Sequence, residues 1–126
     1  MEYTEIYRRL MEETAIVTFL KRDGKIRNML ATRNIRTMNL CEDCNINSMS
    51  WHDKKCGIDN GNVAVMDLII GEGRSFNVER LIRITFVGVI DSIERFEQVC
   101  KEFKEFREQY EAENVMELTM NTFEQG

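Results

Sequence analysis

Three of the chain's four cysteines, its only histidine and its only tryptophan fall within residues 41–56, CEDCNINSMSWHDKKC. The spacing Cys41-x2-Cys44-x7-His52-x3-Cys56 combines thiol and imidazole groups, which are the usual ligands of zinc. These four side chains could close a tetrahedral structural zinc site and so hold a long polar loop without regular secondary structure. The His-x3-Cys half is less diagnostic than a second Cys-x2-Cys pair, and reduced thiols in a surface loop are the favoured alternative.

The same segment contains one pair that resembles catalytic machinery. His52 and Cys56 would form a base and a nucleophile only on a helix, where residues four apart meet, and the local sequence does not indicate a helix. No orienting group and no phosphate-binding glycine motif accompanies them, so the sequence predicts no catalytic residue and a non-enzymatic protein. No cofactor other than zinc is implied. The fourth cysteine, Cys100, falls on an apolar helical stripe and is expected in the core.

A second group of residues could bind anions. Residues 21–36 carry six basic residues and one acidic residue, whereas residues 91–126 carry ten acidic and four basic residues, within a net charge of −5. Guanidinium groups match the geometry of phosphate, and a tryptophan can stack on a base, so this segment predicts a nucleotide or nucleic-acid site. The overall acidity disfavours long nucleic acid more than a compact nucleotide. The candidates are Arg22, Lys25, Arg27, Arg33, Arg36 and Trp51.

The elements that must position these groups begin with a short helix at residues 4–13, followed by a hairpin. Two β-prone runs flank Asp23-Gly24, which is a strong signal for a two-residue type I′ turn. That turn would pair Leu20 with Arg27. The second face would carry Arg22, Lys25 and Arg27 near the tip, with Thr18 and Met29 further in, so the hairpin is predicted as a basic tip on a mostly buried pair of strands. The core face of the hairpin would carry Ala15, Val17, Phe19, Ile26 and Leu30.

The rest of the chain predicts further short strands and one long helix. A short strand is expected at residues 36–40 and longer ones at residues 62–70 and 75–90, the last beginning with a helical turn. The sequence therefore predicts an α+β fold with a mainly β core: a small Sm-like or SH3-like barrel with a short N-terminal helix and a long C-terminal amphipathic helix. The single domain spans 1–126, with a barrel core at 15–90, a long loop at 39–61, a C-terminal helix at 91–113 and a tail at 114–126.

The C-terminal helix has a wide aromatic stripe. Core packing is the first interpretation of this stripe, and a surface for assembling a homo-oligomer is the alternative. The interface candidates are Phe96, Phe103, Phe106 and Tyr110. The tail is expected to add a strand or arm, or to dock on a second subunit.

One ordered set of segments is similar to a known group of proteins. VTFLKRDGKIRNMLATRN at residues 17–34, followed by NGNVAVMDL and RSFNVERLIRI, resembles small proteins of large tailed bacteriophages that are described as WYL-like domains with an Sm-like SH3 β-barrel fold. The resemblance covers roughly residues 15–85. It implies the barrel and a phage origin, whereas the Trp-Tyr-Leu triplet of the broader class is absent and the long acidic helix is additional.

These observations predict a phage accessory protein that binds and neutralises a host factor, such as a defence protein, through its acidic helix. The alternative is an Sm-like barrel that binds a nucleotide or nucleic acid and has a ligand-sequestering or a regulatory role. The expected partners are a second copy of the chain and a host protein, and no membrane. The N-terminal residues lack an apolar signal segment, so the sequence predicts a cytoplasmic protein, in the host cytosol if phage-encoded.

Overall fold

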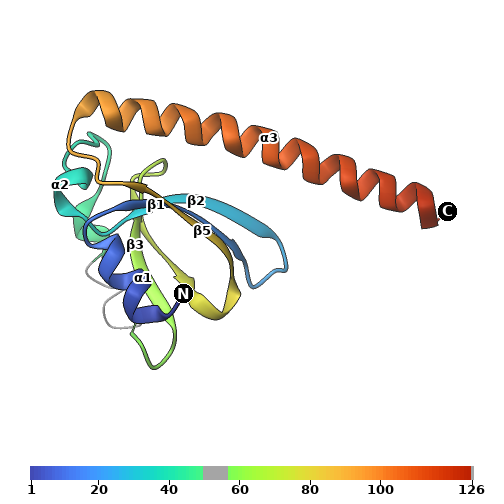
Figure 1. Ribbon diagram of the computed structural model, residues 1–126, viewed down its shortest axis with the longest axis horizontal. Helices are drawn as coiled ribbons and strands as arrows, with labels where there is room; N and C mark the ends of the chain where they lie inside the picture. Colours follow the sequence, from blue (N-terminus) through green and yellow to red (C-terminus); the bar gives the residue numbers. More distant parts are fainter. Residues whose placement is uncertain (50–56, 126) are drawn as a thin grey trace.

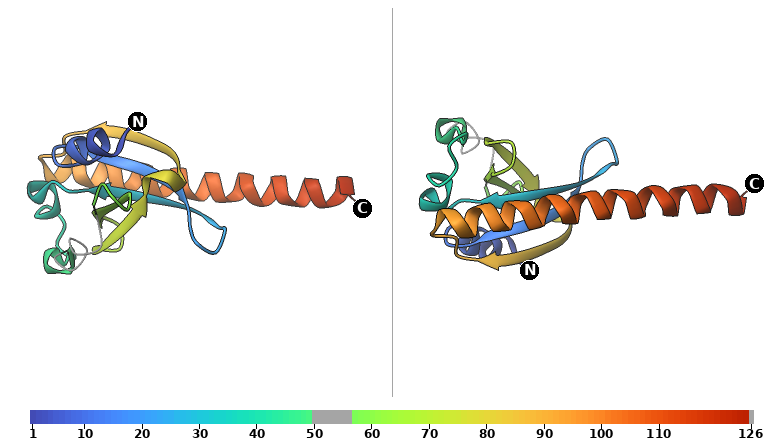
Figure 2. Two further views of the ribbon diagram at one scale, coloured as in Figure 1. Left: turned by 90° about the horizontal axis from the view of Figure 1, so that it is seen from below. Right: turned by 90° about the horizontal axis from the view of Figure 1, so that it is seen from above.

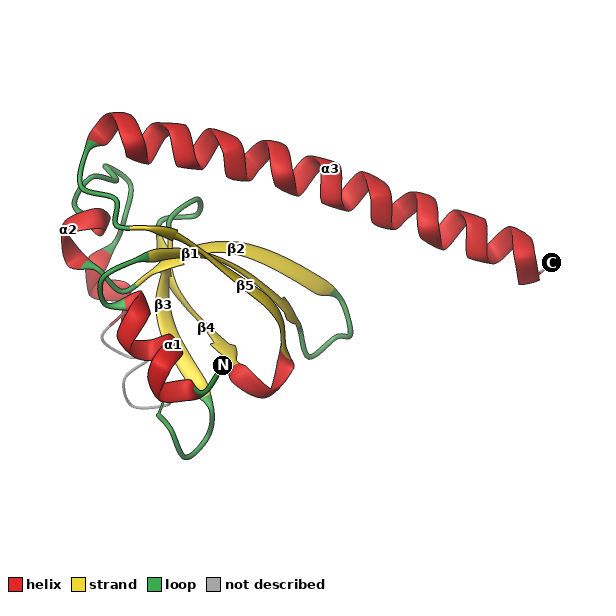
Figure 3. Cartoon of the chain, in the orientation of Figure 1, coloured by secondary structure: helices red, strands yellow, loops and turns green. Residues whose placement is uncertain are grey.

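The chain folds around one five-stranded antiparallel sheet (Figure 1 and Figure 3). The computed structural model describes residues 1–49 and 57–125, and for Met49 and residues 111–125 it describes the backbone alone. The elements are α1 (Tyr3–Leu10), β1 (Thr14–Leu20), β2 (Ile26–Thr32), α2 (Ile35–Met38), η1 (Ile46–Met49), β3 (Asn62–Asp67), β4 (Glu72–Asn77), η3 (Val78–Arg80), β5 (Leu81–Gly88) and α3 (Ile93–Gln125). The strand order is β4-β3-β2-β1-β5, which confirms the α+β class.

The β1–β2 hairpin has a longer turn than the sequence predicts. Phe19 pairs with Arg27, and the N–H of Lys21 donates to the carbonyl of Lys25 at 2.8 Å. The connection is therefore a three-residue loop ending in Gly24, which has a φ of +85°. This combination of a turn and a glycine in the left-handed region is common in hairpins. The predicted two-residue turn and its pairing are wrong by one position.

Because of this one-residue shift in register, each side chain of β2 points to the opposite face of the sheet from the one predicted. Met29, and not Leu30, pairs with Val17 and shares its core, because neighbouring residues on a strand point to opposite faces. Ile26 was also predicted in the core, but it is 46% exposed at the end of the hairpin. Away from its tip the hairpin is buried on both faces, which agrees with the prediction of a basic tip on a mostly buried pair of strands.

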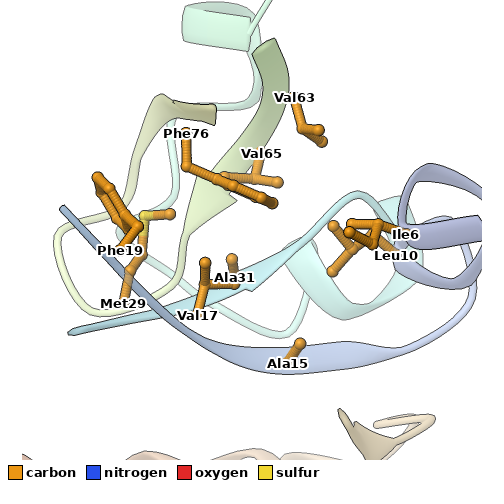
Figure 4. Close-up of a cluster of buried hydrophobic side chains, with 10 residues drawn as sticks. All are labelled: Ile6, Leu10, Ala15, Val17, Phe19, Met29, Ala31, Val63, Val65 and Phe76. Carbon is orange, nitrogen blue, oxygen red and sulfur yellow. The ribbon is translucent and has the colours of Figure 1, made fainter. Parts of the chain in front are cut away.

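The sheet separates two apolar cores. One core lies against α1 and joins Ile6, Leu10, Ala15, Val17, Phe19, Met29, Ala31, Val63, Val65 and Phe76 (Figure 4). The other lies on the opposite face, beside α2 and α3, and joins Leu30, Met38, Met66, Leu68, Ile90, Val99 and Phe103. Helices on both faces explain why β1, β2 and β3 contain so few polar residues at their centres.

A short helix, α2, occupies the region where a strand was predicted at residues 36–40. The side-chain oxygen of Asn34 accepts hydrogen bonds from the N–H of Arg36 at 2.9 Å and of Thr37 at 3.3 Å. Asparagine is a favoured N-cap because it satisfies N–H groups that have no partner within the helix. The Thr37 hydroxyl then donates to the carbonyl of Ile90 at 2.7 Å, which ties α2 to the segment before α3.

The strand β4 lies in a region for which the sequence predicts a turn and a helical corner. This strand pairs with the whole of β3, from Asn62 opposite Asn77 to Asp67 opposite Glu72. The strand predicted at residues 62–70 ends early, at Asp67, because that carboxylate caps a turn instead of continuing the ladder. The helical turn expected before the last strand is present as η3.

The sheet is open among the residues that the structure describes. Its two edge strands are β4 and β5, and no ladder joins them within the described ranges. The three-residue turn η3 connects the two edges directly in sequence.

The C-terminal helix is longer than predicted. It begins at Ile93, where the hydroxyl of Ser92 accepts a hydrogen bond from the N–H of Arg95 at 3.2 Å, and it runs to Gln125. Its 33 residues make a rod about 50 Å long at the rise of an α-helix. The predicted tail at 114–126 is thus helical as far as it is described, and Figure 2 shows α3 extending past the sheet.

Candidate functional site

The predicted anion-binding residues do not form one patch. Arg22 and Lys25 are exposed on the β1–β2 loop, whereas Arg36 is exposed on α2. Figure 1 shows this loop and α2 at opposite ends of the sheet. Arg27 lies between them and faces the buried carboxylate of Asp67, with 3.8 Å between Nη2 and Oδ2. Among the candidates that the structure describes, Arg22 and Lys25 are the two that remain exposed together to act on one ligand.

Arg33 has a structural role on the α1 side of the sheet. Its Nη1 donates to the carbonyl of Ala64 and its Nη2 donates to the hydroxyl of Tyr7 at 3.1 Å. The guanidinium carbon also lies 4.4 Å from the centre of the Tyr7 ring. These contacts join α1 to β3 beside a cavity of about 430 Å³. The cavity is lined by Tyr3, Thr4, Tyr7, Arg33, Gly57, Ile58 and Ala64.

The predicted zinc ligands are described in part. Cys41 and Cys44 lie in the connection between α2 and η1, and the Cys41 thiol donates a weak hydrogen bond to the carbonyl of Leu68, with 3.9 Å between the atoms. His52 and Cys56, together with Trp51, lie outside the described residues. Among the residues described, no three histidine, cysteine or acidic side chains are grouped to hold a metal ion. The zinc site therefore stays a prediction.

The environments of Cys44 and Cys100 favour the protonated thiol. Burial raises the pKa of Cys44, and the adjacent Cys41 thiol raises it further, as do the negative charges of Asp43 and Asp67. Burial also raises the pKa of Cys100, against a smaller opposing effect of Lys104. Because the thiolate is the nucleophile, these thiols are poor nucleophiles at neutral pH.

The loop that carries Cys41 and Cys44 is held against the turn between β3 and β4. The N–H of Asn45 donates to the carbonyl of Gly71 at 2.7 Å, and the hydroxyl of Ser48 accepts from the N–H of Gly73 at 2.7 Å. The close approach requires glycine, because a Cβ atom at Gly71 would lie 2.5 Å from the carbonyl oxygen of Asp43. This contact fixes one wall of a groove.

A groove of about 770 Å³ lies between that loop and the first half of α3. It is lined by Asn39, Leu40, Cys41, Glu42, Asp43, Leu68, Ile69, Ile93, Phe96, Glu97, Cys100, Lys101, Lys104, Glu105 and Glu108. Five of these residues are acidic and two are basic, and all seven charged residues are exposed. Leu68 and Phe96 are more buried, so the groove has an apolar floor and a charged rim. We call it the acidic groove.

The acidic groove is only partly encoded in local sequence patterns. The acidic excess of residues 91–126 was visible, and it correctly marks the α3 side of the groove. The opposite wall comes from residues 39–43 and 68–69, and nothing local in these segments indicates that they meet α3.

The aromatic stripe of α3 packs mainly on the chain itself. Phe103 is 1% exposed and belongs to the core beside the sheet, and Phe96 and Phe106 are partly buried against the same core. The Tyr110 ring lies tilted against Phe106 with 5.8 Å between ring centres, and it remains partly exposed. Of the four interface candidates, Phe103 is inaccessible to a partner while α3 stays on the sheet.

Comparisons with known proteins give no further identification. No protein-family model matches the chain, and no curated protein sequence or solved structure matches it. Within the described ranges, no helix combines the length and the apolar composition that crossing a membrane requires.

Proposed function

We propose that this chain is a non-enzymatic protein-binding protein and that α3 is its docking arm for a basic partner. The observation that carries the proposal is the extension of α3 past the sheet (Figure 2), combined with the charge of its last part. Residues 111–125 contain four acidic residues and no basic residue. Such a segment is electrostatically complementary to a basic protein surface, and that complementarity speeds association and selects partners.

The energetics of a projecting helix support a partner. Helices of about 12 to 15 residues are marginal in water when they do not pack against other structure. A partner that covers α3 beyond the sheet would supply the missing packing. The sequence of this segment provides the apolar residues for it, namely Ala112, Val115, Met116, Leu118, Met120 and Phe123.

We infer that the partner is a host factor, and that binding neutralises it. The inference follows the resemblance to small proteins of tailed phages, which encounter host proteins in the bacterial cytosol. A defence protein that binds nucleic acid has a basic surface, and an acidic helix can occupy that surface in place of the phosphate backbone. The raised thiol pKa values of Cys44 and Cys100 support a role without covalent chemistry.

We also propose that the sheet is of the Sm-like SH3 type. Two observations support this: β5 returns to pair with β1 in the register Val17 to Ile84, and the two sheet edges are joined by only the short turn η3. In a barrel of this type β4 and β5 would meet and close the sheet.

A nucleotide- or nucleic-acid-binding role is the alternative function. It would rest on Arg22 and Lys25, which are exposed together on the β1–β2 loop. The other arginines weaken it, because Arg27 faces Asp67 and Arg33 is hydrogen-bonded within the chain. Titration of the protein with a nucleoside triphosphate and with single-stranded oligonucleotide tests this alternative.

The docking arm is tested with a charge-neutral variant of full-length protein. The variant replaces Glu111, Glu113, Glu117 and Glu124 with Gln. The matched control replaces four acidic residues far from α3 with Gln, namely Glu2, Glu5, Glu12 and Glu79. A host protein captured by the wild-type chain should be lost with the first variant and at high salt, and retained with the control.

Hydrogen exchange then identifies the binding segment. With the purified partner added, the amides of residues 111–125 should become protected, because a bound partner would oppose local opening of this part of α3. If a captured partner leaves exchange in this segment unchanged, or binds the variant and the control equally, α3 is not the docking arm.

A further inference from the structure

We propose that the β1–β2 loop of one copy binds in the acidic groove of a second copy. The loop is a basic projection with three basic residues and one acidic residue over 21–25. The acidic one, Asp23, is already engaged: its carboxylate lies 3.5 Å from the ammonium of Lys21 and accepts a hydrogen bond from the N–H of Lys25 at 2.9 Å. No ion pair to Arg22 or Lys25 is present among the described residues.

The base of the same loop carries an exposed apolar pair. Leu20 and Ile26 lie directly opposite each other in the ladder, so they share one face of the hairpin. They are 39% and 46% exposed. The projection therefore combines positive charge at its tip with apolar surface directly behind it.

The acidic groove has the complementary arrangement. Its apolar floor includes Leu68 and Phe96, and its rim includes Glu97, Glu105 and Glu108 on α3. Within the described part of the chain these three glutamates form no ion pair. Lys101 and Lys104 on the same helix reduce the negative charge of the rim, but the groove keeps five acidic residues against two basic ones.

The occupant must come from another molecule. In Figure 1 the β1–β2 loop curves away from α3, whereas the groove begins at the α2 end of the sheet, where residues 39–43 form its wall. The paired strands β1 and β2 hold the loop at its own end, so it cannot fold back into the groove of its own chain.

A second copy of the chain carries the same basic loop, so no other kind of partner is needed to fill the groove. In a dimer with two-fold symmetry, the loop of each copy enters the groove of the other, and the contact is made twice. The loop is also prepared for binding, because Asp23 and Gly24 fix its conformation before contact. This contact does not depend on the proposed partner of the last part of α3.

Sedimentation velocity of the full-length protein tests the proposal with two charge-reversed variants. The loop variant is Arg22→Glu with Lys25→Glu, and the groove variant is Glu97→Lys with Glu105→Lys. Each should weaken the dimer by about thirtyfold, because four surface charges per dimer are reversed. An equal mixture of the two variants should associate again, because every reversed loop then meets a reversed groove.

Matched controls and a milder variant keep the result interpretable. Arg8→Glu, at an exposed position of α1 outside the loop and outside the groove lining, is the control, and it should leave the dimer unchanged. If a reversed variant fails to fold by circular dichroism, Arg22→Gln with Lys25→Gln replaces it. A wild-type chain that stays monomeric at high concentration, or a mixture that does not associate again, overturns the proposal.

Discussion

Gly71 is the point where the loop carrying Cys41 and Cys44 comes closest to the rest of the fold, so Gly71→Ala tests how the wall of the acidic groove is held. Alanine at a φ of +82° costs about 1 kcal/mol, because its Cβ crowds the backbone in the left-handed region. The new Cβ would also lie 2.5 Å from the carbonyl oxygen of Asp43, so the loop must move away.

That movement has a cost that can be worked from the hydrogen bonds. The N–H of Asn45 donates to the carbonyl of Gly71 at 2.7 Å, and losing such a bond costs about 1 kcal/mol. The neighbouring bond from Gly73 to Ser48 would weaken as well, for about 1 kcal/mol more. We therefore expect the free energy of unfolding to fall by about 3 kcal/mol in Gly71→Ala.

Urea denaturation measures this change, and Gly24→Ala is the matched control. Gly24 has a similar φ of +85°, but a Cβ placed there meets no atom within 4 Å. It should therefore cost only the backbone term, about 1 kcal/mol. If Gly71→Ala destabilises the chain no more than Gly24→Ala does, the loop is not held against the β3–β4 turn in the manner described.

The other predictions concern the core, the thiols and the contacts by which Arg33 joins α1 to β3. Phe103→Ala should lower the free energy of unfolding by about 3 to 5 kcal/mol because it leaves a core cavity. Tyr110→Ala should lower it by less than about 1.5 kcal/mol. Equal losses of the two variants in urea denaturation would contradict the burial of Phe103. Folding raises the pKa of Cys44 and of Cys100, so the folded chain holds these thiol protons more tightly than the unfolded chain does. The two thiols therefore contribute fully to stability below the unfolded thiol pKa of about 8.5, and this contribution falls as the pH rises above that value. Denaturation between pH 7 and 10 should show this loss, and replacing both residues with Ser should reduce it; an unchanged slope would refute the assignment. Arg33→Leu should destabilise by about 2 kcal/mol through its lost hydrogen bonds, whereas a change near zero would show that α1 is held by apolar contacts alone.

The sequence by itself determined the elements whose signals are local. The N-terminal helix, the hairpin around Asp23-Gly24 and the C-terminal helix all follow from patterns within about 20 residues, because helix periodicity and turn chemistry act over short distances. Asn34 shows that a local signal can be overlooked: its capping role was available in the sequence, and it would have predicted α2 in place of a strand.

Local signals could not decide the structure where one short sequence is compatible with two backbone geometries. The dipeptide Asp23-Gly24 fits a two-residue turn as well as the end of a three-residue loop, and the difference of one residue exchanges the two faces of β2. Similarly, β4 begins among turn-forming glycines, and it becomes a strand because β3 offers it a complete ladder partner.

Only the tertiary structure decided where the groove and the exposed basic residues lie. The acidic groove joins residues 39–43, 68–69 and one side of α3, which are far apart in the chain and meet because they pack against the same core on one face of the sheet. In the folded chain Arg27 faces Asp67 and Arg33 donates to Tyr7, so neither belongs to an open anion site. Arg22 and Lys25 remain exposed on the β1–β2 loop. Charge composition is a property of sequence, but the position of a charge relative to a groove is set by long-range packing, which no local pattern encodes.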